Sequence, residues 1–269
     1  MKDNLPQFKF PQRRTYSWVI PVIILLVFIA LWEIWVQFGN IPKWQLPAPS
    51  AIAQELVASW SLLLHHAYIT LQEIVIGFLV ALALGLLLAT VIVRSKILER
   101  ALLPILVSSQ TIPIIAIAPL LLIWVGYGLA SKVIVVALIS FYPIAVNTID
   151  GLKAINTDMV AMMRSLGASR WQIFTKLQVP TSLPYIFSGI KVGISISVIG
   201  AVIGEWVGAS GGLGYLIKYS QPLFLTSRVF AAIFVLSVMG VGLFALAGLV
   251  ERLMLPWYYA EKRAKSADQ

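Results

Sequence analysis

Long apolar runs are the feature that most restricts how this chain can fold. Six of them fit the sequence, at roughly 18–38, 68–93, 101–125, 130–149, 184–207 and 229–250. Each can cross about 30 Å of hydrocarbon as a helix that rises about 1.5 Å per residue. Hydrophobic residues make up 59% of the chain and charged residues 12%, whereas soluble domains hold about 45–50% and about 25%. We therefore expect an all-α membrane protein with six transmembrane helices over residues 18–250.

The first apolar run is expected to remain in the mature protein. A secretory signal peptide has a shorter apolar core and a cleavage site built from small residues. Here the run carries Trp32, Glu33 and Trp35 near its end, and no such site follows them. Residues 1–17 then form an N-terminal tail, and residues 251–269 form a C-terminal tail.

The distribution of Lys and Arg predicts the orientation, because cytoplasmic segments carry the excess of these residues. With the N-terminus in the cytosol, the inner segments hold most of the 20 cations: Lys2, Lys9, Arg13, Arg14, Arg94, Lys96, Arg100, Lys153, Arg164, Arg170, Lys176, Arg252, Lys262, Arg263 and Lys265. The outer segments hold Lys43, Lys132, Lys218 and Arg228. We therefore expect both termini, and a long loop over about 151–183, to be cytoplasmic. The net charge of +9 then reflects membrane orientation and does not indicate a nucleic-acid partner, which would need cations on a soluble face.

The segment between the first two runs is expected to lie at the membrane surface. It opens with several prolines, which suggest a turn, and Ser50 is a suitable N-cap. Ile52, Leu56 and Val57 then recur at helical spacing. This pattern predicts a short interfacial helix at about 50–64.

Prolines and glycines mark special positions inside the runs. Pro104, Pro113 and Pro119 interrupt the third run, and each removes a backbone donor and tends to bend a helix. Such a bend could face a pathway or serve packing alone. The fifth run holds two pairs of glycines four residues apart, which suit close helix contact in a bundle or a dimer. They are Gly189, Gly193, Gly200 and Gly204.

The inner loop contains a basic segment, Met159 to Pro184, that carries three cations and no acid. Asp158 can cap a first helix that ends before Gly167, a residue suited to left-handed backbone. Ser169 can cap a second helix, Arg170–Gln178, which Pro180 would stop. Methionines line one side of the first helix, and such surfaces adapt to a partner. The residues alone leave two interpretations open: the loop packs under its own bundle, or it docks on another protein.

The stretch "MMRSLGASRWQIFTKLQVPTSLPYIFSGIK" resembles the cytoplasmic loop of ABC importer permeases. That loop has the signature Glu-Ala-Ala, three residues, Gly, nine residues, Ile-x-Leu-Pro. The last four signature positions are taken here by Gly167, Leu177, Val179 and Pro180. Ala161, Met162 and Met163 replace Glu-Ala-Ala, so the docking surface would lack the polar contact of that Glu. "LPAPS", "SQTIPIIAIAPLLLIWVGYG" and "GEWVGASGGLGYLI" extend the resemblance over nearly the whole chain, toward the nitrate, sulfonate, taurine and bicarbonate branch.

The resemblance implies a type I importer permease in a bacterial plasma membrane. Its partners would be a second copy of this chain or a close homologue, two ATPase subunits and an extracytoplasmic solute-binding protein, within a lipid bilayer. ATP and Mg would bind to the ATPase subunits and no cofactor to this chain, which contains no G-x-x-x-x-G-K-[ST] phosphate loop. The implied coupling residues are Asp158, Ala161, Met162, Met163, Arg164, Ser165, Leu166, Gly167, Ala168 and Ser169.

Candidates for the translocation pathway or its gate are Pro113, Asn147, Lys191, Ser195 and Glu205. An acid near a membrane span is costly and often functional, although Glu205 could also sit in headgroup water. Lys191 could snorkel to the inner surface or attract an anionic solute. The stretch after Glu205 could line a gate or form a plain connector.

The sequence offers no catalytic set. There is no acid pair, nucleophile–base pair or metal-ligand spacing, and the adjacent His65 and His66 point in different directions on a helix, which suits no metal. We expect neither an enzyme nor a metal site. By resemblance the substrate is a small oxyanion such as nitrate, sulfonate, taurine or bicarbonate, with a thiamine pyrimidine precursor or riboflavin as the alternative. A secondary transporter or a membrane scaffold that uses no ATP is the alternative of another class, and an intramembrane enzyme is a third.

Overall fold

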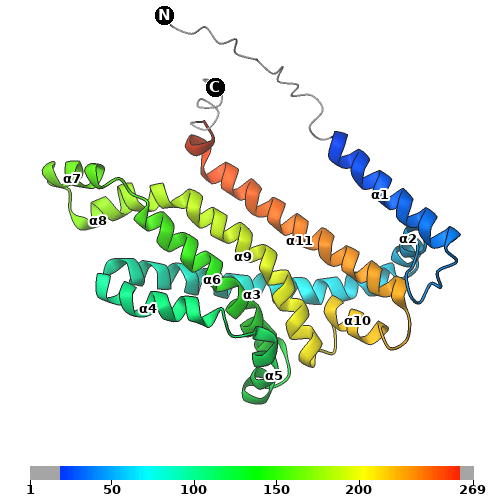
Figure 1. The fold of residues 1–269 in the computed structure, drawn as a ribbon. Coiled ribbons are helices and arrows are strands. Elements are labelled where there is room, and N and C mark those ends of the chain that lie inside the picture. Colours follow the sequence, from blue (N-terminus) through cyan, green and yellow to red (C-terminus); the bar gives the residue numbers. More distant parts are fainter. Residues whose placement is uncertain (1–18, 261–269) are drawn as a thin grey trace, which may run out of the picture.

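The computed structural model describes residues 19–260, and every regular element in that range is helical. The helices are α1 (Val19–Phe38), α2 (Pro49–Ala58), α3 (Trp60–Arg94), α4 (Lys96–Ser109), α5 (Ile114–Val125), α6 (Leu129–Lys153), α7 (Thr157–Ser165), α8 (Arg170–Ile173), α9 (Val179–Gly208), α10 (Leu213–Ser220) and α11 (Thr226–Met254), with a π-helical turn at Phe174–Gln178 (Figure 1). The predicted N-terminal tail and all but the first part of the C-terminal tail lie outside the described residues.

The apolar runs all become helices, as predicted. Five helices are long and apolar enough to cross a membrane: Val19–Phe38, Trp60–Arg94, Leu129–Lys153, Arg170–Gly208 and Thr226–Met254. The sixth candidate span is the pair α4 and α5, which is bent by 95° at a short break.

Of the three prolines in this broken span, only Pro113 marks the break. It is the residue before α5, in extended backbone, and it has no N–H with which to continue α4. Pro104 and Pro119 lie inside α4 and α5 instead. The expectation that all three interrupt the third run is therefore wrong for two of them.

Helix α6 forms the centre of the bundle because glycines on both neighbouring helices let it approach closely. On α3, a Cβ added at Gly85 would lie 3.1 Å from the Ile144 Cβ. On α9, a Cβ at Gly189 would lie 2.9 Å from the Pro143 carbonyl oxygen, and one at Gly193 would lie 3.0 Å from Ile144. The glycine pairs predicted to serve close helix contact do so, against α6.

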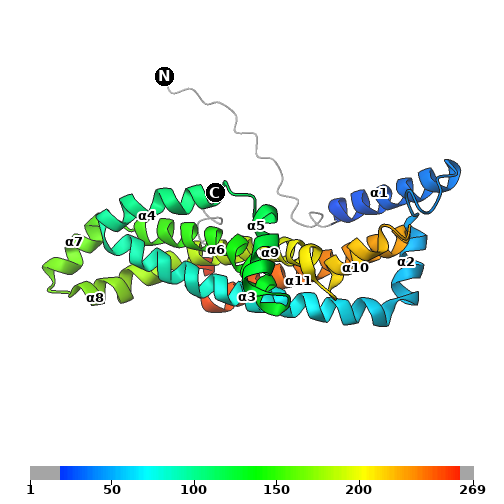
Figure 2. The ribbon, with the colours of Figure 1, turned by 90° about the horizontal axis from the view of Figure 1, so that it is seen from below.

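The remaining elements lie around this three-helix core. Figure 2 shows α7 and α8 at one end of the molecule and α1, α2 and α10 at the other. Helix α1 stands largely apart: Val36 is its one buried residue, and Trp32 contacts Phe230 of α11 at 5.8 Å between ring centroids.

The interfacial helix predicted at about 50–64 is shorter than expected. Helix α2 ends at Ala58 and the long α3 begins at Trp60, so the second half of the predicted range belongs to a spanning helix. Ser50 is not the N-cap, because Pro49 already opens the first turn and Ala48 precedes it. The Ser50 hydroxyl and amide donate instead to the Glu33 carboxylate, at 2.7 and 2.9 Å.

Candidate functional site

The predicted helix–Gly–helix pair forms at the exposed end of the bundle. Gly167 follows α7 with φ of +82°, and the amide of Ala168 donates to the Met163 carbonyl at 3.0 Å. Gly167 is suited to this position because left-handed backbone carries no Cβ penalty there. Ser169 caps α8 through a reciprocal pair of hydrogen bonds with Gln172. These two features confirm the prediction.

Two details of the pair differ from the prediction. The cap of α7 is Asn156, whose side chain accepts from the Asp158 amide at 2.8 Å, so Asp158 lies inside the first turn and is not the cap. The second helix does not stop at Pro180. The π-helical turn shifts the hydrogen-bond register just ahead of Pro180, which then sits in the first turn of α9, where its missing N–H costs little.

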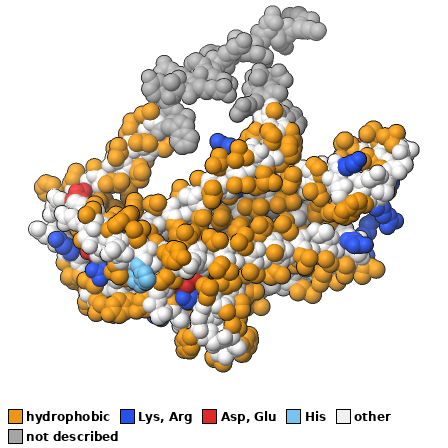
Figure 3. All heavy atoms as spheres, turned by 180° about the vertical axis from the view of Figure 1, so that it is seen from behind, with side chains coloured by type: hydrophobic (Ala, Val, Ile, Leu, Met, Phe, Trp, Pro, Cys, Tyr) orange, Lys and Arg blue, Asp and Glu red, His pale blue; other side chains and the backbone are white. Residues whose placement is uncertain are grey.

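Most of the α7–α8 segment (Thr157–Ile173) is exposed, and only its last residue, Ile173, is buried. No residue of α7 is buried, and Met162, Leu166 and Trp171 are 53%, 78% and 70% exposed. Arg164 and Arg170 are exposed beside them. Figure 3 shows Lys and Arg side chains gathered near this end of a surface that is otherwise mostly hydrophobic. The exposure of α7 favours docking on another protein over packing under its own bundle.

One continuous rod joins this segment to the opposite end of the molecule. Residues Arg170–Gly208 form one continuous helical span through α8, the π-helical turn and α9. At about 1.5 Å per residue, a span of 39 residues is about 58 Å long. The span therefore connects α8 to the far end of α9 without a break in the helix.

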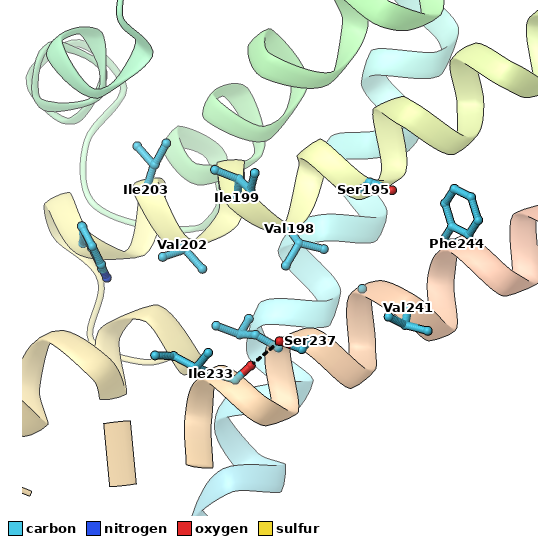
Figure 4. Close-up of a pocket in the computed structure, with 12 residues that line it drawn as sticks. Ser195, Val198, Ile199, Val202, Ile203, Ile233, Ser237, Val241 and Phe244 are labelled. Atoms are coloured by element: carbon cyan, nitrogen blue, oxygen red, sulfur yellow. Dashed lines mark hydrogen bonds between the residues drawn. The ribbon is translucent and has the colours of Figure 1, made fainter. Parts of the chain in front are cut away.

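A groove of about 640 Å³ lies between α9 and α11, and Figure 4 shows its lining. The walls are almost entirely apolar, with Val198, Ile199 and Trp206 on α9 and Val241 and Phe244 on α11. Ser195 and Ser237 supply the only hydroxyls among its lining residues. Both are already committed to carbonyls of their own helices, at 2.9 Å each.

Lys191 lies one turn beyond Ser195, toward the α7–α8 end. Its Nζ forms an ion pair with Glu251 Oε2 of α11 at 2.8 Å. Glu251 is 4% exposed, and the charge of Lys191 is therefore matched within the protein. The ion pair is a contact that neither interpretation of Lys191, snorkelling or anion attraction, included.

Glu205 is buried and does not sit in headgroup water. It is 1% exposed and accepts hydrogen bonds from Thr70 Oγ1 at 2.6 Å and from the amides of Gly214 and Tyr215 at 2.5 and 3.2 Å. The segment after it, α10, packs with α3 and α11 in an apolar cluster that includes Leu63, Leu213 and Leu216. This segment is a packed helix and not an extended connector.

A second buried ion pair lies near Glu205. Lys132 of α6 binds Glu73 of α3 at 2.6 Å, and their side chains are 10% and 1% exposed. The sequence analysis assigned Lys132 to an outer segment and gave it no partner. The available signal was that opposite charges stood at matching depths on two helices. The same signal would have paired Lys191 with Glu251.

The five pathway candidates do not converge on one site. Ser195 lines the groove, Pro113 stands at the bend before α5, and Asn147 donates to the Pro143 carbonyl at the contact of α6 with α9. Lys191, near the middle of α9, and Glu205, near its C-terminal end, are held in separate polar contacts. Among the described residues no group of three His, Asp or Glu side chains could hold a metal ion.

A bundle of apolar helices with an exposed helix–Gly–helix pair is the arrangement expected of an ABC importer permease. Comparison with known proteins agrees with this class. Residues 81–256 match the family described as "Binding-protein-dependent transport system inner membrane component". The chain belongs to this family and is the permease subunit of an ABC importer. The methionine transporter MetNI, in an inward-facing conformation, has the same fold: its matching chain aligns with a TM-score of 0.64 at 20% identity, over 73% of this chain and 97% of that one.

Relatives within the family carry several substrate names. The chain is 39% identical to the formylaminopyrimidine transport permease ThiX of Halalkalibacterium halodurans, over 91% of this chain and 98% of the relative. It is 38% identical to the riboflavin transport permease RibX of Chloroflexus aurantiacus, over 96% and 99%. Permeases named for aliphatic sulfonates, taurine and nitrate match at 26% to 32% identity. The branch expected from the sequence is confirmed.

Proposed function

We propose that this subunit forms the translocation pathway and that its α7–α8 segment docks on a separate ATPase subunit. The observation that carries the proposal is the exposed, Met-rich face of α7, which has no buried residue. A flexible apolar surface of this kind adapts to the groove of a partner. The chain itself has no phosphate-binding loop, so the energy must come from that partner.

The assembly follows from the same proposal. Two copies of this chain, or one copy and a close homologue, would each receive one ATPase subunit. A solute-binding protein would dock at the α10 end. Both termini would be cytoplasmic, on the side of the α7–α8 segment, because the inner segments carry most of the cations.

The coupling mechanism uses the rod of residues 170–208 as a lever. Closure of the ATPase subunits would move the α7–α8 segment, and the rod would carry that motion to the far side of the membrane. A two-state element that a partner biases is the physical content of such coupling. The groove between α9 and α11, which is bridged by the Lys191–Glu251 pair at one end, is where the helices can separate.

For the substrate, a planar nitrogen heteroaromatic compound fits better than an oxyanion. The lining of the groove holds no Lys, Arg or His, and the nearest cation, Lys191, is neutralised by Glu251. An oxyanion needs cations or free N–H donors along its route. The two relatives at 38% and 39% identity are named for riboflavin and a formylaminopyrimidine, which supports the same assignment.

A small oxyanion is the second candidate, because relatives named for sulfonates and nitrate also match along most of the chain. Uptake into proteoliposomes that contain this permease, its ATPase and its solute-binding protein separates the two. ATP-dependent uptake of riboflavin or a formylaminopyrimidine supports the first, and uptake of taurine or nitrate alone contradicts it. Uptake without the ATPase subunit, or failure of that subunit to co-purify, contradicts the importer mechanism and favours a secondary transporter.

A further inference from the structure

The start of α10 is held by side chains from two other helices. The first four N–H groups of a helix have no partner within the helix. Here the amide of Gly212 donates to His66 Nδ1 at 3.0 Å, and that of Leu213 donates to Thr70 Oγ1 at 2.8 Å. The amides of Gly214 and Tyr215 donate to Glu205. We call His66, Thr70 and Glu205 the α10 collar.

The collar is buried and closely fitted. Its three residues are 8%, 0% and 1% exposed in the order His66, Thr70, Glu205. The Thr70 hydroxyl of α3 donates to Glu205 of α9 and accepts from the amide of Leu213 in α10. Thr70 therefore links α9 to α10. A Cβ at Gly212 would lie 2.1 Å from the Glu205 carboxylate and one at Gly214 would lie 2.7 Å from it. Glycines here let the backbone approach the carboxylate directly.

The carboxylate is suited to this place for two reasons. A negative charge is stabilised at the N-terminus of a helix by the aligned peptide dipoles. Hydrogen bonds to an ionised acceptor are also stronger than neutral ones. Glu205 therefore ties the start of α10 to the C-terminal end of α9, in addition to the apolar packing of α10.

Glu205 also lies near the end of the rod of residues 170–208, whose first residues belong to α8. The collar thus attaches α10 to the far end of the same rod that carries the α7–α8 segment. The outward side of α10 is accessible, since Tyr219 is 55% exposed and Lys218 is exposed beside it. This side offers a surface at the end where the proposed function places the solute-binding protein.

We propose that Glu205 is a positioning residue that joins α10 to this rod, so that docking of the solute-binding protein on α10 reaches the α7–α8 segment through it. The inference rests on the proposed function. Glu205 would then connect the outer surface of α10 to the segment that contacts the ATPase subunit. Weakening its hydrogen bonds to α10 should remove the response of the ATPase to the binding protein.

The test compares Glu205→Gln with Glu205→Asp. Gln keeps the volume but removes the charge, and its NH₂ group replaces an oxygen that accepts from Thr70 or from the α10 amides, whereas Asp keeps the charge. Glu251→Gln is the matched control, because Glu251 is also a buried carboxylate but lies on α11 and pairs with Lys191, away from α10. Thr70→Val and Thr70→Ser give a second pair, should Glu205→Gln fail to fold.

Two readouts are measured on the reconstituted complex. Hydrogen exchange at the Gly214 and Tyr215 amides should rise about tenfold or more in Glu205→Gln, because charge-assisted bonds are lost, and should not change in Glu251→Gln. The ratio of ATP hydrolysis with the solute-binding protein to hydrolysis without it should fall toward one in Glu205→Gln and recover in part in Glu205→Asp. A purely structural residue would change the first readout and leave this ratio intact.

Each outcome is decisive. Faster exchange with an unchanged stimulation ratio overturns the proposal, and so does unchanged exchange in Glu205→Gln. If the unmodified complex shows no stimulation by the binding protein, the proposed function fails and the role of Glu205 is not what failed.

Discussion

At the scale of single residues, the charges inside the bundle are matched by partners that the sequence alone does not reveal. Linear position gives the depth of a residue in a span, but it does not give the neighbouring helix or the direction of the side chain. Lys191 and Glu205 could therefore be placed at the ends of the fifth run, while their contacts with Glu251 and with Thr70 depend on how α9 packs against α11 and α3.

The Glu73–Lys132 pair provides a test of this matching. Lys132→Met should destabilise the protein by about 3–5 kcal/mol, because it leaves Glu73 buried and unpaired, and the double variant Glu73→Leu/Lys132→Met should recover most of that loss. The matched control is Lys153→Met, which breaks an exposed pair with Glu99 and should cost about 0–1 kcal/mol. Unfolding in detergent measures all three, and equal losses in the two single variants would contradict the account.

Gly167 allows the effect of backbone strain on folding to be distinguished from its effect on the coupling of ATP hydrolysis to uptake. A side chain in left-handed backbone costs about 1 kcal/mol or more, so Gly167→Ala should lower the coupling of ATP hydrolysis to uptake while membrane insertion is retained. Gly126→Ala is the control, since Gly126 also has a positive φ, of +90°, and open space around it. Gly167→Pro and Arg164→Glu should uncouple more strongly. Normal transport by both would show that the α7–α8 segment is not the lever.

At the scale of elements, hydrophobic periodicity and capping residues predicted where most helices lie. The end of one helix depended on backbone geometry that these signals do not report. The apolar runs, the Gly167 turn and the Ser169 cap all follow from local rules. The end of the second coupling helix does not, because a π-helical turn at Phe174–Gln178 lets the chain continue through Pro180. Such a turn depends on the packing around it and has no simple sequence signature.

The close contact of α6 with α9 should be sensitive to a single methyl group. In Gly189→Ala the new Cβ would meet the Pro143 carbonyl oxygen at 2.9 Å, and overpacking of this kind costs about 1–3 kcal/mol. Gly248→Ala in α11 has nothing within 4 Å and should be neutral or slightly stabilising, since Ala is the better helix former. Melting temperatures of the two purified variants measure the difference, and a neutral Gly189→Ala would contradict this packing.

At the scale of the whole molecule, the account is one of two ends joined by a rod. One end exposes a basic and apolar helical pair, and the other holds α10 in a collar of buried polar groups. The sequence predicted the first end through a local motif. It could not predict the collar, which brings His66 and Thr70 of α3 to Glu205 of α9 and the start of α10 only after the bundle has formed.

The most direct measurement asks on which side of the membrane the α7–α8 segment lies and whether a partner covers it. The chain has no cysteine, so Ser169→Cys introduces a single thiol at the exposed turn. We expect a membrane-impermeant maleimide to label it only in inside-out vesicles, and we expect the ATPase subunit to protect it. Labelling confined to right-side-out vesicles, or labelling that the bound ATPase subunit does not reduce, would contradict the account.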